Sequence, residues 1–136
     1  MVDDRDLMGE RPKVLKDMKT TVKTLCGDMD VIVTHMPDGR PREVFISMGK
    51  NGQCTTCLTE TLGRMISTSL RYGVPISVIA DQLKGVKCGQ PVYDGKFMFY
   101  SCVDAVAYVL SEMHEEGTNE FTTTVRLSKT TNQGGV

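Results

Sequence analysis

Two glycines and two cysteines near the middle of the chain have a spacing that suggests chemistry. Gly49 and Gly52 can adopt the positive φ that other residues avoid, so the backbone can turn sharply and point successive N–H groups in one direction. Cys54 and Cys57 follow, three residues apart, in the first turn of a predicted helix. The orphan N–H groups of that turn and the positive end of the helix dipole favour an anion or a thiolate. The same pattern also suits a plain strand-to-helix turn with two small buried thiols.

The chain contains five cysteines, an odd number that does not suit a disulfide framework. A reducing cytosol would keep the thiols free in any case, so free or metal-bound thiols are the better interpretation. Cys102 lies at the predicted start of a helix, where the dipole should favour the thiolate and lower the pKa of the thiol. Only one Cys-x-x-Cys pair is present, so spacing alone leaves metal binding open.

Length and composition indicate a single globular domain. The 136 residues fit one domain, and 40% hydrophobic and 24% charged residues are ordinary values. The formal net charge of -1 gives no basic surface for nucleic acid or acidic membranes. No apolar run approaches the ~20 residues of a membrane span, and the first residues lack the features of a signal peptide. We therefore expect a cytoplasmic protein that has neither nucleic acid nor membrane as a partner.

The first half of the chain predicts a short antiparallel meander. Residues prone to form strands occupy 20–25, 31–35 and 43–47. The first two segments are separated by a turn signal at Cys26-Gly27-Asp28, and the last two by the Asp38-Gly39 pair, which favours a hairpin turn. A polar and charged stretch over 1–11 precedes the meander and is expected to be an exposed lead-in.

Helical periodicity follows. An apolar stripe predicts the buried face of a helix of about three turns, formed by Leu58, Leu62, Met65, Ile66 and Leu70. A shorter helix is predicted between Pro75 and Gly85, a small hairpin over 92–99, and a last helix over 101–113. Alternation over 121–127 allows one late strand in a tail, 115–136, that is otherwise expected to fray. The predicted class is α+β, a short antiparallel β-meander followed by two to three packed helices.

Ser101 and Asp104 have the spacing of a helix capping box. In that arrangement Ser101 accepts a hydrogen bond from the Asp104 amide, while the Asp104 carboxylate reaches back to the Ser101 amide. These two residues are therefore predicted to fix the start of the last helix, with Cys102 between them.

Seven blocks of residues form an ordered series, namely 26–27, 38–45, 49–54, 60–64, 70–74, 82–88 and 101–105. The series resembles the TSCPD domain, which is found at the C-terminal end of adenosylcobalamin-dependent (class II) ribonucleotide reductases and in short stand-alone proteins. The likeness extends from about Arg11 to Leu110 and places a TSCPD-like domain at 12–114. The family's name motif reads Tyr100-Ser101-Cys102-Val103-Asp104 here, with Tyr and Val in place of Thr and Pro.

The resemblance assigns the family's four cysteines to Cys26, Cys54, Cys88 and Cys102, while Cys57 is extra. One hypothesis is that these four bind a structural Zn²⁺ tetrahedrally and tie the meander to the helices. The resemblance further implies an accessory or ligand-binding module connected with ribonucleotide reduction and deoxyribonucleotide metabolism. A class II reductase needs a catalytic barrel of several hundred residues, so we do not expect this chain alone to reduce ribonucleotides.

Two other functions remain open. In the first, a phosphorylated small molecule such as a nucleotide binds to backbone amides and basic side chains. The residues of that site would be Gly49, Lys50, Asn51, Gly52, Arg64 and Arg71. In the second, Cys54 and Cys57 act as a thiol redox pair. The implied partners are a ribonucleotide reductase or a nucleotide, and exposed strand edges would also allow a homo-oligomer.

Overall fold

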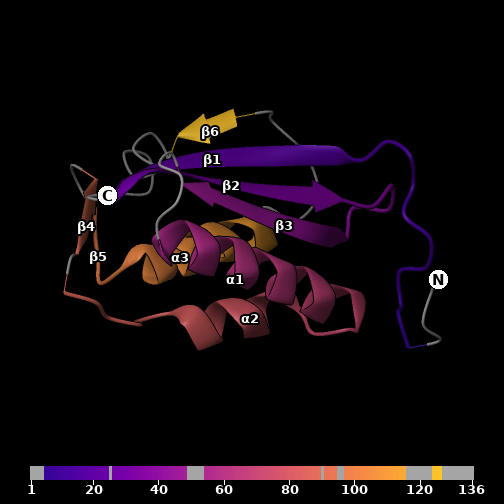
Figure 1. The fold of residues 1–136 in the computed structure, drawn as a ribbon. Helices are drawn as coiled ribbons and strands as arrows, with labels where there is room; N and C mark the ends of the chain where they lie inside the picture. The colour runs from indigo at the N-terminus through magenta and orange to yellow at the C-terminus, as the bar shows by residue number, and fades with distance from the viewer. Residues whose placement is uncertain are drawn as a thin grey trace.

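A three-stranded antiparallel meander forms one layer of the molecule in a computed structural model, which describes residues 5–24, 26–48, 54–89, 91–94, 97–115 and 124–126. The strands are β1 (Lys16–Thr24), β2 (Gly27–His35) and β3 (Pro41–Met48). A short strand, β6 (Thr124–Arg126), pairs parallel with β1 and completes the sheet order β3-β2-β1-β6. Figure 1 shows this sheet above the helices.

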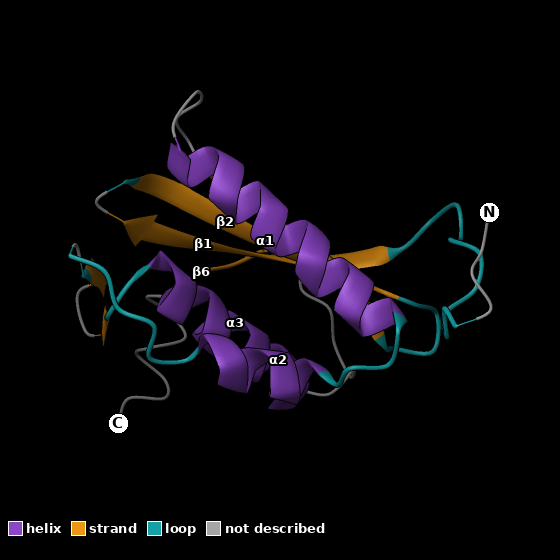
Figure 2. Cartoon of the chain, turned by 60° about the horizontal axis from the view of Figure 1, so that its bottom comes forward, coloured by secondary structure: helices purple, strands orange, loops and turns teal. Residues whose placement is uncertain are grey.

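Three helices lie on one side of the sheet (Figure 1). They are α1 (Cys54–Arg71), α2 (Ile76–Leu83) and α3 (Cys102–Glu115). Helix α1 lies along β3, whereas α2 packs beside α3, as Figure 2 shows. A hairpin of β4 (Val92–Asp94) and β5 (Phe97–Phe99) separates α2 from α3. The predicted α+β class is confirmed.

The strand register lines up apolar side chains on the helix-facing side of the sheet. Alternate residues of a strand point to one face, so each cross-strand row on this face buries three neighbours. All of the side chains in these rows are at most 6% exposed. The rows are Met18–Val33–Val44, Thr20–Val31–Ile46 and Val22–Met29–Met48.

The buried face of α1 differs from the predicted one. Ile66 and Leu70 are buried as expected, but Leu58 and Met65 are 66% and 60% exposed. Thr59 and Gly63 occupy buried positions instead. The prediction was wrong for Leu58 and Met65 because hydrophobicity alone cannot foresee a helix that docks through its small residues.

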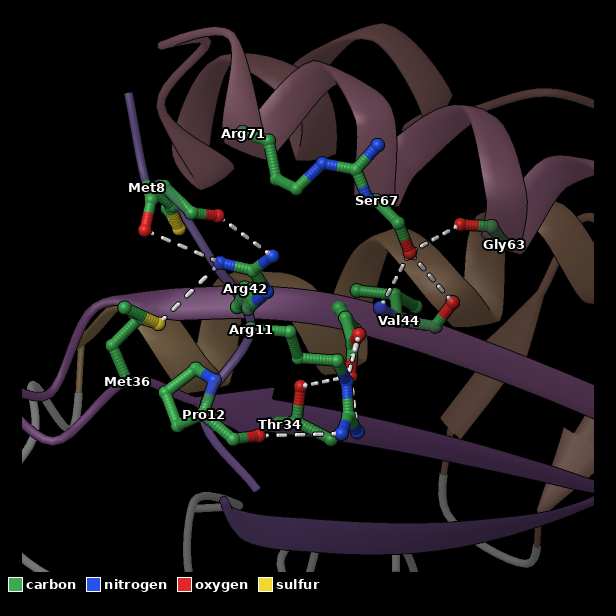
Figure 3. A network of polar contacts seen from close by, with 12 residues as sticks. Met8, Arg11, Pro12, Thr34, Met36, Arg42, Val44, Gly63, Ser67 and Arg71 are labelled. Atoms are coloured by element: carbon green, nitrogen blue, oxygen red, sulfur yellow. Dashed lines mark hydrogen bonds and ion pairs between the residues drawn. The ribbon is translucent and has the colours of Figure 1, made fainter. Parts of the chain in front are cut away.

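Gly63 and Ser67 bring α1 against the backbone of β3. A Cβ placed on Gly63 would lie 2.8 Å from the Val44 carbonyl oxygen and 3.3 Å from the Ile46 nitrogen. The Val44 N–H donates to Ser67 Oγ (2.9 Å), and the Ser67 hydroxyl is within donating distance of the Val44 and Gly63 carbonyls (3.2 and 2.8 Å), as drawn in Figure 3. The helix thus satisfies polar groups that an edge strand would otherwise expose.

We predict that Gly63→Ala destabilises the protein. The new methyl group would meet backbone atoms, which cannot move as a flexible side chain can, and overpacking of this kind costs about 1–3 kcal/mol. The gain in helix propensity, at most about 1 kcal/mol, should not offset it. Urea unfolding followed by circular dichroism measures the change. Gly89→Ala is the control, because its Cβ would meet nothing within 4 Å. Equal stability of the two variants would contradict this account of the contact.

Candidate functional site

The segments that carry the four predicted metal ligands lie at one end of the molecule. Cys26 is in the turn between β1 and β2, and Cys88 is in the loop between α2 and β4. Cys54 and Cys102 are the first residues of α1 and α3. In Figures 1 and 2 the β1–β2 turn and the starts of both helices lie at the same end. We call this end of the molecule, which carries the four cysteines, the thiol end.

Hydrogen bonds around Asp104 hold the loop of Cys88 against the start of α3. The Asp104 carboxylate accepts from the backbone N–H groups of Gly85 (2.7 Å) and Tyr100 (3.0 Å). The Cys88 N–H donates to the Tyr100 carbonyl (3.1 Å). These bonds join two segments that are distant in the chain, so Cys88 and Cys102 are positioned by one network.

One of the two hydrogen bonds of the predicted capping box is present. Ser101 Oγ accepts from the Asp104 N–H (3.0 Å), as expected. The Asp104 carboxylate, however, binds the amides of Gly85 and Tyr100 rather than that of Ser101. The Ser101 hydroxyl also donates to the Val86 carbonyl (2.6 Å), which further ties the loop to the helix.

Burial and two other cysteines affect the pKa of Cys102. Cys102 is half-buried, whereas Cys26, Cys54 and Cys88 are exposed. Burial raises the pKa of the Cys102 thiol, the thiols of Cys26 and Cys88 raise it further, and a hydrogen bond with Thr24 acts in the opposite direction. The expectation that the pKa of Cys102 falls was therefore wrong, because burial, the largest of these effects, disfavours the thiolate.

Cys26 and Cys88 thus lie near enough to Cys102 to affect its pKa, and Cys54 begins a helix at the same end. Among the described residues, no group of three or more Cys, His, Asp or Glu side chains has the geometry to hold a metal ion. Cys54 and Cys57, the predicted redox pair, lie in the first turn of α1 as exposed free thiols. The thiol end therefore offers the right donor atoms without the closed arrangement of a ligand set.

A groove between β3 and α1 brings together the two arginines of the predicted phosphate site. Its volume is about 590 Å³, a size suited to a small molecule. Arg64 and Arg71 line it from α1, and Ser47 lines it at the end of β3. The other members of that predicted site, Gly49, Lys50, Asn51 and Gly52, lie outside the described residues. The remaining lining residues are Glu43, Val44, Phe45, Ile46, Glu60, Ser67 and Thr68.

Both arginines of the groove have acidic partners. Arg64 Nη2 lies 3.1 Å from Glu60 Oε2, one helical turn away, in a pair that is 78% and 61% exposed. Arg71 Nε lies 3.2 Å from Asp6 Oδ2, and these side chains are only 30% and 11% exposed. The two cations thus differ in how strongly water screens their pairs.

Asp6 belongs to a segment over 5–11, which we call the N-terminal strap. Asp6, Met8 and Gly9 of this strap are half-buried, and its other residues are exposed. Arg11 forms a bidentate pair with Glu43 (2.7 and 3.1 Å). Burial tends to raise the pKa of Glu43, but hydrogen bonds from Arg11 and Thr34 hold it below its usual value. Sequence analysis missed these contacts, because residues so far apart in the chain leave no local pattern.

Comparison with known proteins identifies the family of this chain. The sequence model of the TSCPD domain matches residues 5–114. This chain belongs to the TSCPD domain family. A 46-residue segment is also 41% identical to a vitamin B12-dependent ribonucleotide reductase of Rhodopirellula baltica (strain DSM 10527 / NCIMB 13988 / SH1).

That segment covers 34% of this TSCPD domain protein but only 4% of the relative, so the chain spans a small fraction of the reductase it matches. No solved structure matches the chain. The family match begins at residue 5 and therefore includes the N-terminal strap. Among the described residues, no helix combines the length and apolar character needed to cross a membrane.

Proposed function

We propose that this TSCPD domain protein is an accessory module of ribonucleotide reduction that acts together with a vitamin B12-dependent ribonucleotide reductase. The observation that carries the proposal is the 41% identity over 46 residues with such an enzyme, together with the family match over 5–114. Because the matched segment is 4% of the relative, what is transferred to this chain is an association with the enzyme and not its reaction.

The reductase association predicts that the two proteins bind one another. Tagged protein, incubated with lysate of its own host, should retain a ribonucleotide reductase that mass spectrometry identifies. Adding the purified chain to that enzyme should change its turnover. Resin that carries no tagged protein controls for nonspecific adhesion. Recovery of neither a reductase nor another enzyme of nucleotide metabolism would argue against the proposal.

We further propose that the thiol end holds a structural Zn²⁺. Thiolate is a preferred ligand of zinc, and four such ligands close a structural site. The residues that would hold the ion are Cys26, Cys54, Cys88 and Cys102. The electrostatic interaction of Cys102 with Cys26 and Cys88 supports the set, as does the start of α1 at the same end. The bound ion would replace the mutual repulsion of the thiolates with attraction to a common charge.

The zinc proposal predicts close to one Zn²⁺ per chain in protein purified without chelator. Cys88→Ser and Cys102→Ser should each lose most of the metal, because a structural site needs all of its ligands. Cys57→Ser is the matched control and should keep it, since Cys57 is not in the proposed set. Mass spectrometry for metals measures the content. Less than about a tenth of an equivalent in the wild-type protein would refute the site.

A second candidate function is the binding of a nucleotide in the β3–α1 groove. The observation that favours it is that one groove of about 590 Å³ is lined by both Arg64 and Arg71. Ser47, which also lines the groove, is two residues before Gly49 in the chain. Arginine guanidinium groups bind phosphate oxygens in a bidentate manner.

If the groove binds a nucleotide, calorimetry should record a heat of binding for at least one member of a panel of mono-, di- and cyclic nucleotides. Arg64→Gln and Arg71→Gln should each weaken the affinity by about tenfold, as expected for the loss of one charge-assisted contact. Arg40→Gln is the control, because Arg40 also has an acidic partner, Asp38, but does not line the groove. A silent panel would remove this candidate and leave the reductase association standing.

A further inference from the structure

We propose that Asp6 of the N-terminal strap is a built-in competitor for Arg71, so that an anionic ligand of the β3–α1 groove must displace this carboxylate to bind. The inference rests on the proposed binding of a nucleotide phosphate in that groove. It assigns to the strap the role of setting the affinity of the site.

The strap places Asp6 beside Arg71 by backbone contacts at the same point. The Leu7 N–H donates to the Arg71 carbonyl (2.7 Å), so the strap is joined to the last residue of α1. Asp6 Oδ1 accepts from the Met8 N–H (2.8 Å), which fixes the direction of the carboxylate. The other oxygen, Oδ2, is then the one that faces Arg71 Nε at 3.2 Å.

The pair with Asp6 leaves Arg71 incompletely satisfied. Nε of Arg71 is buried and makes no hydrogen bond of acceptable geometry, although Asp6 Oδ2 is at ion-pair distance. A buried donor without a well-aligned acceptor is costly. Asp6 therefore neutralises the charge of Arg71 but does not use its full hydrogen-bonding capacity. A phosphate that took the place of this carboxylate would supply both the negative charge and an aligned acceptor.

The strap does not depend on Asp6 alone. Arg42, which is 5% exposed, donates to the Met8 and Gly9 carbonyls (3.4 and 3.3 Å), as Figure 3 shows for Met8. Arg11 holds the far end of the strap through its bidentate pair with Glu43. Removal of the Asp6 charge should therefore free Arg71 while the strap stays in place.

Coupling between the strap and the groove follows from the residues they share. Arg71 and Glu43 both line the groove and both bind the strap. A ligand can bind Arg71 only if Arg71 releases Asp6. By linkage, the strap lowers the affinity of Arg71 for the ligand by the same factor as the ligand lowers its affinity for the strap. The strap thus acts as a tethered anion at the end of the site.

The experiment compares ADP binding to the wild-type protein and to Asp6→Asn by calorimetry. Asp6→Asn should bind ADP about fivefold more tightly, at the lower end of typical coupling between sites. Asp38→Asn is the matched control. It removes the same charge from a pair with Arg40, which does not line the groove, and should leave the affinity unchanged. Asp6→Glu keeps the charge and should stay close to wild type, and circular dichroism checks that each variant folds.

The outcomes separate the two proposals. Binding of ADP with equal affinity by wild type and Asp6→Asn would overturn the competition and leave groove binding intact. An equal gain in Asp6→Asn and Asp38→Asn would also overturn it, because net charge would then explain the effect. Absence of binding in every variant would overturn groove binding itself and the competition with it. A gain confined to Asp6→Asn supports both.

Discussion

The close approach of α1 to the edge strand β3 is the contact on which the rest of the structure depends. Gly63 lets the helix backbone reach Val44, and the Ser67 hydroxyl binds the backbone N–H that β3 would otherwise leave open. This contact protects the sheet edge from pairing with another chain at Val44. It also fixes the two walls of the groove relative to each other, so that Arg64 and Arg71 face the same space as Glu43 and Ser47.

The thiol end depends on a different principle, the satisfaction of backbone groups at a helix start. The amide of Asp104 is bonded to Ser101, and the Asp104 carboxylate takes the amides of Gly85 and Tyr100. The Asp104 amide, a donor in the first turn of α3, is therefore already bound to a side chain and is not directed at the Cys102 thiol. Burial then dominates and, with the neighbouring thiols, raises the pKa of Cys102. A raised pKa makes the Cys102 thiol less reactive as a nucleophile, and under the zinc proposal the charge of the bound cation would favour its thiolate.

Sequence alone predicts those features that depend on residues close together in the chain. The meander and the β4–β5 hairpin follow from alternation and from Asp-Gly pairs, and both are present. The face of α1 could not be foreseen, because its docking depends on a close backbone contact made through Gly63. The partner of Arg71 could not be foreseen either. Asp6 is distant in sequence and reaches Arg71 only because the strap returns to the end of α1.

The balance of charge in the groove determines how it can discriminate between ligands. Each arginine already has a carboxylate neighbour, so the groove does not attract every anion through a net positive field. The Arg64–Glu60 pair is well solvated and contributes little, so a ligand exchanges it at small cost. The Arg71–Asp6 pair is only partly exposed to water, so under the proposed function a ligand that displaces Asp6 must offer Nε a well-aligned acceptor. Under the proposed function, affinity is therefore set by fit at Arg71, whereas Arg64 adds attraction that changes with salt.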